Sequence, residues 1–183
     1  FYKAKHLRNI RLPENLTSIG AGAFEDAASL NAVRLPEKLK ELGDMAFRGC
    51  TALKSINIPK GITEIPLGCF CMCSALEDVD LEEGITNIAW GAFDECAELS
   101  EVTLPASLKK MESWAFANSG LLSITIPGGV DIEDGSIFYQ CKNLKSVCIE
   151  NGIKSLKGTF DGCSKLETVK LPRSLKIIGA DTF

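Results

Sequence analysis

The phenylalanines of this chain recur at an almost constant spacing, which constrains the fold more than any other feature of the sequence. Successive phenylalanines lie 22 or 23 residues apart, and they are Phe1, Phe24, Phe47, Phe70, Phe93, Phe116, Phe138, Phe160 and Phe183. Self-similarity with a period of about 20 to 30 residues indicates a solenoid, in which each repeat forms one coil. Because one repeat cannot bury its apolar face alone, stacked coils must share the core. We therefore expect a continuous stack in which Phe70, Phe93 and Phe116 form one interior column.

Each repeat also carries a short strand followed, in most repeats, by a proline. Apolar residues keep fixed places within the repeat, and after Phe47 they are Leu53, Ile56, Ile58, Ile62 and Ile65. The triplet Ile56-Asn57-Ile58 predicts a strand with two side chains inward and one outward. Proline lacks an N–H donor, so Pro59 suits the place where the strand stops. The glycine- and alanine-rich segments before the phenylalanines predict tight bends. No segment sustains the i, i+3, i+4, i+7 spacing of an amphipathic helix, so we expect little helix.

The pattern Leu-x-x-Ile-x-Ile-Pro-x-x-Ile-x-x-Ile, followed by Ala-Phe-x-x-Cys-x-x-Leu, is similar to the Treponema-type, or BspA-like, leucine-rich repeat. Residues 53–73 show it well, and residues 99–121 show a variant with serine in the cysteine place. The resemblance covers the entire chain. It implies an α/β-type leucine-rich-repeat solenoid, strand-rich and with little helix, a right-handed coil of about eight repeats of 22–23 residues with a parallel concave sheet. It also implies a secreted or surface protein of a host-associated bacterium, with a role in adhesion.

Composition limits the classes of function and the extent of the domain. The net charge is −4 and the isoelectric point is about 5.2, so a general nucleic-acid footprint is absent. No apolar stretch approaches the roughly 20 residues that span a bilayer, so we expect no membrane insertion. The sequence shows no signal peptide, and it starts and ends on the repeat phenylalanine without the polar caps of solenoid ends. We expect residues 1–183 to be a single leucine-rich-repeat domain, a fragment of a longer array.

Most of the eight cysteines fall on one repeat position, three residues after the phenylalanine. They are Cys50, Cys73, Cys96, Cys141 and Cys163, and Ala4, Ala27 and Ser119 occupy the same place in other repeats. A position that accepts alanine, serine and cysteine is a small buried slot, in which a free thiol behaves as a small hydrophobe. The coil spacing suits a disulfide by Cα distance, but parallel side chains disfavour one. We therefore interpret these residues as reduced and buried.

The remaining chemistry-bearing residues offer little for catalysis. Cys69, Cys71 and Cys73 have a spacing that could recruit a soft metal, but structural zinc takes four ligands and the repeat brings no others nearby. His6, the only histidine, lies at the edge of the array and has no triad partners in the pattern. The sequence contains no phosphate-binding glycine motif. We expect no cofactor, no metal and no enzyme activity; an enzyme centred on Cys71 or Cys148, the two accessible thiols, is the alternative.

The outward strand residues form the candidate binding face. If a ligand binds there, the central strands should carry it, with Arg34, Asn57, Asp78, Asp80, Glu101 and Thr103 as the site residues. The like charges of Asp78, Asp80 and Glu101 would destabilise neighbouring strands. A basic partner or a cation would relieve them, or solvent screening would suffice. The hypothesis is therefore a noncatalytic module that binds a protein ligand, such as a host extracellular protein.

Two alternatives remain open at this stage. The charged strand positions also fit an ordinary solvated surface, and the array would then be a structural spacer that presents another domain. Trp90 and Trp114 lie just before their repeat phenylalanines, where they either pack along the turn or form a lateral contact patch. Residues 128–135 depart from the repeat and predict a local bulge, which is a binding loop or simple repeat drift.

Overall fold

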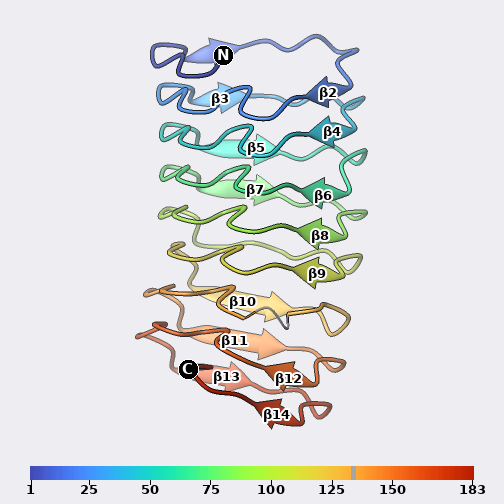
Figure 1. The fold of residues 1–183 in the computed structure, drawn as a ribbon, viewed down its shortest axis with the longest axis vertical. Helices are drawn as coiled ribbons and strands as arrows, with labels where there is room; N and C mark the ends of the chain where they lie inside the picture. Colours follow the sequence, from blue (N-terminus) through green and yellow to red (C-terminus); the bar gives the residue numbers. More distant parts are fainter. Residues whose placement is uncertain (133–134) are drawn as a thin grey trace.

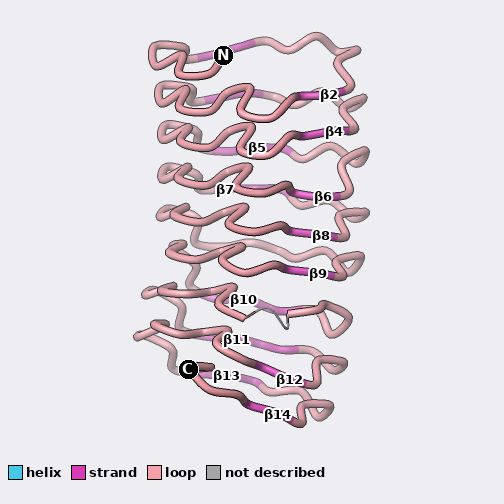
Figure 2. Tube along the Cα trace, in the orientation of Figure 1, coloured by secondary structure: helices cyan, strands magenta, loops and turns pink. Residues whose placement is uncertain are grey.

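The chain folds as a stack of similar coils, with its two ends at opposite ends of the stack (Figure 1). The computed structural model describes residues 1–132 and 135–183. The described residues form only short strands and loops, and none of them forms a helix (Figure 2). Accordingly, no described segment is a helix that could cross a membrane. The expectation of a strand-rich solenoid with little helix is confirmed.

The predicted strands form a first row along the stack, which we call the first strand row. They are β1 (Asn9–Ile10), β3 (Ala32–Val33), β5 (Ser55–Asn57), β7 (Asp78–Asp80), β10 (Ser123–Ile126), β11 (Ser146–Ile149) and β13 (Thr168–Lys170). All the pairs among them are parallel: β1 with β3, β5 with β7, β10 with β11, and β11 with β13. Ser55 lies opposite Asp78, one repeat period further along the chain. The register is thus set by the repeat.

A second strand row runs along another part of each coil, and the sequence pattern did not predict it. Its strands are β2 (Ser18–Ile19), β4 (Glu41–Leu42), β6 (Glu64–Ile65), β8 (Asn87–Ile88), β9 (Lys110–Met111), β12 (Ser155–Leu156) and β14 (Ile177–Ile178). These strands also pair in parallel, for example β6 with β8 and β8 with β9. The arrows of the two rows point in opposite directions in Figure 1, because the chain turns back within each coil.

A column of stacked phenylalanine rings forms the centre of the core. Neighbouring ring centroids are 5.1–5.8 Å apart and their planes differ by 5–11°. The rings of Phe70, Phe93 and Phe116 are completely buried, whereas Phe1 and Phe183 are largely exposed at the ends. The predicted interior column is confirmed.

The bend before each ring has a left-handed backbone. Two residues before the phenylalanine, φ is close to +60° at Gly68 and Gly91, a conformation that glycine adopts without steric cost. Met45 and Trp114 take the same conformation in their coils, with φ of 56° and 64°. We call this position the left-handed slot.

The irregular sixth repeat keeps its connection to the stack. Asp131 N–H donates to the carbonyl oxygen of Lys109, Met111 N–H donates to that of Asp131, and Ile132 is buried. The predicted bulge over residues 128–135 includes residues 133 and 134, which lie outside the described residues.

Candidate partner-binding face

The structure brings the six predicted site residues together on the first strand row. Two shallow hollows lie there, of about 470 and 430 Å³. The first is lined in part by Arg34, Asn57, Asp78 and Asp80, and the second by Asp78, Asp80, Glu101 and Thr103. Asp78 and Asp80 belong to both hollows, so the two form one continuous surface over neighbouring coils.

The acidic side chains of this surface are exposed and unpaired. Asp78, Asp80 and Glu101 are all exposed. Among the residues that the structure describes, these three carboxylates form no salt bridge, while nearby Lys54 and Lys60 pair with other glutamates. Their negative charge is therefore available to a partner.

The ladder of the first strand row is interrupted twice among the described residues, between β3 and β5 and again between β7 and β10, where these charges meet. The segment 101–103 continues the row in position but has no strand assigned, so the described ladder stops between β7 and β10. The expectation was that Glu101 and Thr103 would lie on a strand, and it is wrong in this respect. Like charges on neighbouring strands destabilise pairing, and Asp78 and Asp80 line one hollow with Glu101. Repulsion among these carboxylates therefore opposes pairing at the second interruption only.

Asn57 has a structural role that the sequence did not reveal. Its Oδ1 accepts a hydrogen bond from Leu35 N–H, and its Nδ2 donates to the Leu35 carbonyl oxygen, both at 3.1 Å. The amide side chain thereby replaces main-chain pairing just beyond the end of β3. Asn57 is half-buried, so it forms a wall of the first hollow and its polar atoms are already engaged.

The basic end of the face has a larger hollow of its own. It measures about 750 Å³ and is lined in part by Arg11, Arg34, Glu37 and Lys38. The predicted site placed Arg34 at its margin and left Arg11 out. Arg11 and Arg34 occupy the same outward strand position in adjacent repeats, so the sequence itself places both arginines on this face.

The five cysteines of the repeat slot are buried free thiols, in agreement with the prediction. Each also donates a hydrogen bond to the carbonyl oxygen of the phenylalanine one coil earlier, at 3.0–3.2 Å, and the donors are Cys50, Cys73, Cys96, Cys141 and Cys163. Burial raises the pKa of the Cys50 thiol to about 12. The Cys50 thiol therefore stays protonated at neutral pH, and all five thiols act as structural donors.

The two thiols outside this ladder that the sequence marked as accessible are only half-buried, as expected: Cys71 after Phe70, and Cys148 on β11. Burial raises the pKa of Cys71, and the nearby Asp94 carboxylate adds to this, while Arg48 opposes it. Since the thiolate is the reactive form, a raised pKa makes Cys71 a poor nucleophile. In the described part of the chain, no three cysteine, histidine or acidic side chains gather as metal ligands would.

A row of stacked aromatic side chains lies outside the binding face. The Trp90 and Trp114 rings are 5.7 Å apart at 15°, and the Trp114 and Tyr139 rings are 5.6 Å apart at 18°. The two tryptophans pack along the turns, which was one of the two alternatives. They are also exposed, which the other alternative, a lateral contact patch, requires. Sequence reasoning missed Tyr139, because it follows its repeat phenylalanine whereas the tryptophans precede theirs.

Comparison with known proteins adds a family and several similar structures. The sequence matches the BspA type leucine rich repeat region, with six copies, over residues 1–119 and 77–183. The fold is similar to a leucine-rich repeat protein from Bacteroides ovatus, with 23% identity and a TM-score of 0.74, over 100% of this chain and 65% of that one. It is also similar to a leucine rich repeat protein of Treponema pallidum, with 26% identity and a TM-score of 0.63, over 94% and 73% of the two chains.

A third similar structure is the pneumococcal vaccine antigen PcpA, with 24% identity and a TM-score of 0.55, over 96% of this chain and 58% of that one. A search of curated proteins finds no match. The chain therefore spans 65% of the length of the Bacteroides protein and 58% of the pneumococcal one. The family match runs from the first residue to the last, and the stacked coils place its repeated strand and phenylalanine positions in register, so the chain belongs to the BspA-type leucine-rich-repeat family.

Proposed function

We propose that the chain is a noncatalytic module that captures a basic protein partner on the first strand row, within a secreted or surface-exposed bacterial protein. The observation that carries this proposal is the surface of two adjoining hollows, where the carboxylates of Asp78, Asp80 and Glu101 are exposed and unpaired. Membership of a leucine-rich-repeat family supports it, because such domains generally mediate protein interactions. An extracellular host protein is the partner class that the family resemblance favours.

The charge pattern gives the face a direction. Arg11 and Arg34 lie at one end, and the acidic residues lie over the central coils. A partner with basic groups opposite Asp78 and Asp80 would approach in one orientation. Electrostatic complementarity of this kind speeds encounter more than it deepens affinity. Binding should therefore weaken as ionic strength rises and the screening length falls below about 8 Å.

The thiols support the noncatalytic part of the proposal. A nucleophilic cysteine needs a stabilised thiolate, whereas burial and Asp94 raise the pKa of Cys71. The buried thiols of the repeat slot donate to main-chain carbonyls. These groups are used for packing and hydrogen bonding between coils.

Charge reversal tests the proposed face. The chain would be immobilised and exposed to a panel of purified extracellular matrix proteins and to an oligolysine peptide, with binding followed by surface plasmon resonance at low and high salt. The double variant Asp78→Lys/Asp80→Lys should lose at least about tenfold in affinity for the basic ligands, and its thermal unfolding should remain nearly unchanged. The control Glu41→Lys/Asp44→Lys makes the same charge change at exposed positions away from both hollows and should bind as the parent does.

Two results would overturn the proposal. Equal binding by the parent and the Asp78→Lys/Asp80→Lys variant would place the site elsewhere. Failure of every ligand in the panel to bind the parent would favour the alternative role of a structural spacer that presents another domain.

A further inference from the structure

We infer that the hollow at the basic end of the first strand row holds an acidic side chain of a protein partner between the guanidinium groups of Arg11 and Arg34. We call this hollow, of about 750 Å³, the arginine hollow. The inference rests on the proposed function in one respect, because it takes the ligand to be part of a protein. It adds a contact of opposite charge to the one made by Asp78 and Asp80.

The pairing of β1 with β3 places the two arginines side by side. Ile10 lies opposite Val33 in the parallel register. Arg11 and Arg34 are the next residues along the two segments, and both are exposed. Because neighbouring strands are about 4.8 Å apart, both guanidinium groups can reach one ligand group. The repeat therefore builds a pair of equivalent donors.

The charge of this pair is not relieved by a direct ion pair. Neither arginine takes part in a salt bridge among the described residues, although Glu14 and Glu37 line the same hollow. Like charges on neighbouring strands repel each other. A carboxylate placed between the two groups would relieve this repulsion, and a planar guanidinium binds a carboxylate through two parallel hydrogen bonds.

The arginine hollow also offers apolar contacts. Ile10, Leu12 and Pro36 line it and are half-buried, so part of each side chain remains accessible. Ligand sites commonly combine an apolar lining with a few charged groups that fix orientation, in a volume of about 300–1,000 Å³. A carboxylate on an apolar stem, as in a glutamate side chain, fits this combination.

The wall beside Arg34 is fixed before a ligand arrives. The side-chain amide of Asn57 binds both the N–H and the carbonyl oxygen of Leu35, each at 3.1 Å. Leu35 follows Arg34 directly and is completely buried. The main chain that carries Arg34 is thus anchored to the next coil, which lowers the ordering cost of binding.

The net charge of the lining matches a single carboxylate. The lining contains three basic side chains and two acidic ones, so its net charge is +1, and these residues are Arg11, Arg34, Lys38, Glu14 and Glu37. A phosphate group carries close to two negative charges at neutral pH. The two glutamates would repel that second charge.

The basic track is too short for a polyanion. In the next two repeats, Asn57 and Asp80 hold the place that Arg11 and Arg34 occupy. A long sulfated glycan or a nucleic acid that continued along the row would meet the exposed carboxylates of Asp78 and Asp80. The row therefore favours a partner with an acidic side chain near one end and basic groups further along.

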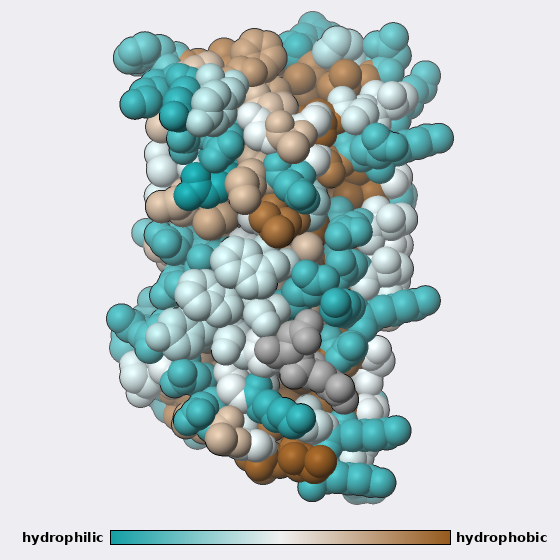
Figure 3. Space-filling view, viewed as in Figure 1, coloured by the Kyte–Doolittle hydropathy of each residue, from teal (hydrophilic) through white to brown (hydrophobic). Residues whose placement is uncertain are grey.

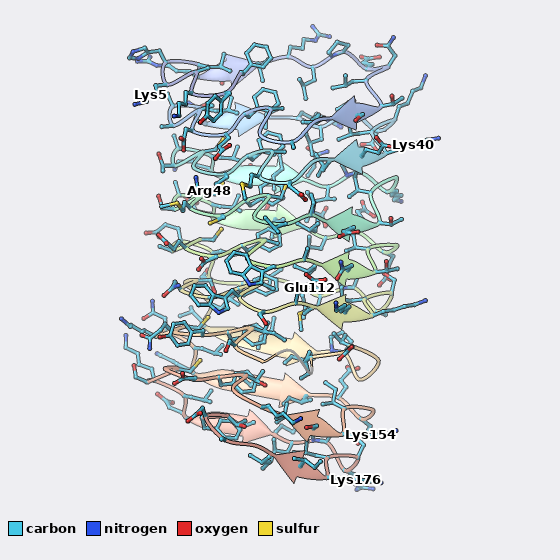
Figure 4. All side chains as sticks on the ribbon, viewed as in Figure 1. Lys5, Lys40, Arg48, Glu112, Lys154 and Lys176 are labelled. Atoms are coloured by element: carbon cyan, nitrogen blue, oxygen red, sulfur yellow. The ribbon has the colours of Figure 1, made fainter. Side chains whose placement is uncertain are left out.

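The basic side chains beside the second strand row lack this arrangement. Long hydrophilic side chains project from that edge of the stack (Figure 3). Figure 4 labels three of its lysines, Lys40, Lys154 and Lys176, which point outward. They line none of the hollows described above. A lysine ammonium is also a strongly hydrated point charge on a flexible stem.

The test uses the complete 183-residue chain and the peptide Ala-Leu-Glu-Leu-Ala, blocked at both ends so that glutamate carries its only charge. An NMR titration should show saturable shifts of the main-chain amides around Arg11 and Arg34, with a Kd below about 1 mM. Replacing the glutamate of the peptide by glutamine should weaken binding at least about tenfold. Arg11→Ala and, separately, Arg34→Ala should do the same. Arg34→Lys should also weaken binding, because lysine keeps the charge but lacks the guanidinium fork.

A second basic hollow, at the other end of the row, supplies the matched control. It measures about 520 Å³ and is lined in part by Lys170 and Arg173. Cys148 lies opposite Lys170 in the strand register, at the place that the two arginines hold in β1 and β3, so paired guanidinium groups are missing there. Lys170→Ala/Arg173→Ala should bind the peptide as the parent does.

Two further measurements separate this inference from the proposed function. Asp78→Lys/Asp80→Lys should not weaken binding of the acidic peptide, and Arg11→Ala/Arg34→Ala should not weaken binding of oligolysine. Each proposal can therefore fail while the other stands.

The inference is wrong if the acidic peptide fails to bind the parent, or if it binds the arginine variants equally well, with folding checked by urea unfolding. Equal weakening by Lys170→Ala/Arg173→Ala would also overturn it, since general attraction of charge would then explain binding. So would heparin, a sulfated polyanion, if it bound at the same amides at least about tenfold more tightly than the peptide, because the track would then serve a polyanion.

Discussion

The thiol of Cys73 donates a hydrogen bond to the carbonyl oxygen of Phe47, 3.1 Å away in the preceding coil. The same contact recurs from Cys96 to Phe70 and from Cys141 to Phe116. A cysteine at this position therefore does more than fill space, because its thiol adds a second hydrogen bond, from the next coil, to a carbonyl that already accepts a main-chain N–H within its own turn. In the five coils that have a cysteine at this position, the thiol links its coil to an earlier one through a hydrogen bond, without a disulfide.

Replacing Cys73 tests this contact. Cys73→Ala removes the thiol donor while the Phe47 carbonyl keeps the main-chain bond from Cys50, so the free energy of unfolding should fall by about 0.5–1.5 kcal/mol, the net contribution of one hydrogen bond. Cys73→Ser keeps a donor and should cost less, as Ser119 occupies the same slot in another coil. Urea unfolding followed by circular dichroism gives both values. Equal losses in the two variants would show that packing, and not the hydrogen bond, sets the effect.

The phenylalanine column should be the most sensitive part of the core. Phe93→Ala removes a completely buried ring that contacts two stacked neighbours at 5.1 and 5.4 Å. The expected loss is about 3–5 kcal/mol in the free energy of unfolding. A reduced urea m-value would show that the neighbouring coils also loosen.

The exposed end ring provides the control for this experiment. Phe183 is 56% exposed, so Phe183→Ala should cost far less. Similar losses at Phe93 and Phe183 would contradict a column that derives its stability from burial.

The parts of the fold that the sequence predicts are those in which one residue type repeats at one position. The phenylalanine spacing predicts the ring column, and the Ile56-Asn57-Ile58 triplet predicts strand β5, since both depend on the burial of particular side chains. The cysteine slot is predicted for the same reason. The register then follows, because equivalent residues of successive repeats lie side by side.

Other features depend on main-chain geometry or on residues that differ among repeats. The two-residue strands of the second row have too few positions for a strand pattern. The side-chain bonds of Asn57 to Leu35 depend on where β3 stops, which no repeated residue marks. Tyr139 joins the row of stacked aromatic side chains from a position that holds Cys71 and Asp94 in other coils, so no periodic signal reveals it. The sequence predicts which strand residues make up the candidate face. It does not predict that the side chain of Asn57 is already hydrogen-bonded to the main chain of Leu35.

The left-handed slot gives a third prediction. Gly91 has φ of 60° and no close obstruction to an added Cβ, so Gly91→Ala introduces backbone strain without a steric clash. The free energy of unfolding should fall by about 1–2 kcal/mol, the cost of a left-handed conformation for a residue with a side chain. Differential scanning calorimetry would measure the accompanying fall in Tm.

Gly20 is the matched control for this substitution. It has open space around its Cβ position and a φ outside the left-handed region. Gly20→Ala should therefore stabilise the fold by about 0.4–1 kcal/mol, through the lower entropy of the unfolded chain. A loss at Gly20 equal to that at Gly91 would rule out the conformational explanation.

Thiol accessibility provides a fourth prediction. Brief treatment with iodoacetamide at neutral pH should modify Cys71 and Cys148, the two half-buried thiols, before the six buried ones. The reaction of Cys71 should keep accelerating as pH rises above the ordinary thiol value of 9.0, because burial raises its pKa. Peptide mapping by mass spectrometry identifies the modified residues, and treatment in denaturing urea gives the reference for full exposure. Uniform labelling in the folded state would contradict the buried ladder.

Asp94 gives the last prediction, which concerns pH. Asp94 is a buried carboxylate whose Oδ1 accepts a hydrogen bond from Asn118 Nδ2 at 2.9 Å. Burial raises its pKa above the ordinary value of 3.8, although the bond from Asn118 opposes this. The folded state then binds the Asp94 proton more tightly than the unfolded state, so the contribution of this group to stability falls as pH rises from 3.8 through the folded pKa.

Asp94→Asn keeps an acceptor for Asn118 and removes the buried charge, so its Tm should exceed that of the parent at pH 7. The difference should shrink as pH falls below the ordinary aspartate value, because the parent carboxyl is then protonated in both states. Thermal unfolding of both proteins between pH 3 and pH 7 (about the range from below the ordinary aspartate pKa to neutrality) measures this difference in Tm. The control is Asp78→Asn at an exposed position, which should change the free energy of unfolding by no more than about 0.5 kcal/mol. A difference between Asp94→Asn and the parent that stays constant with pH would mean that the charge of Asp94 does not cause it.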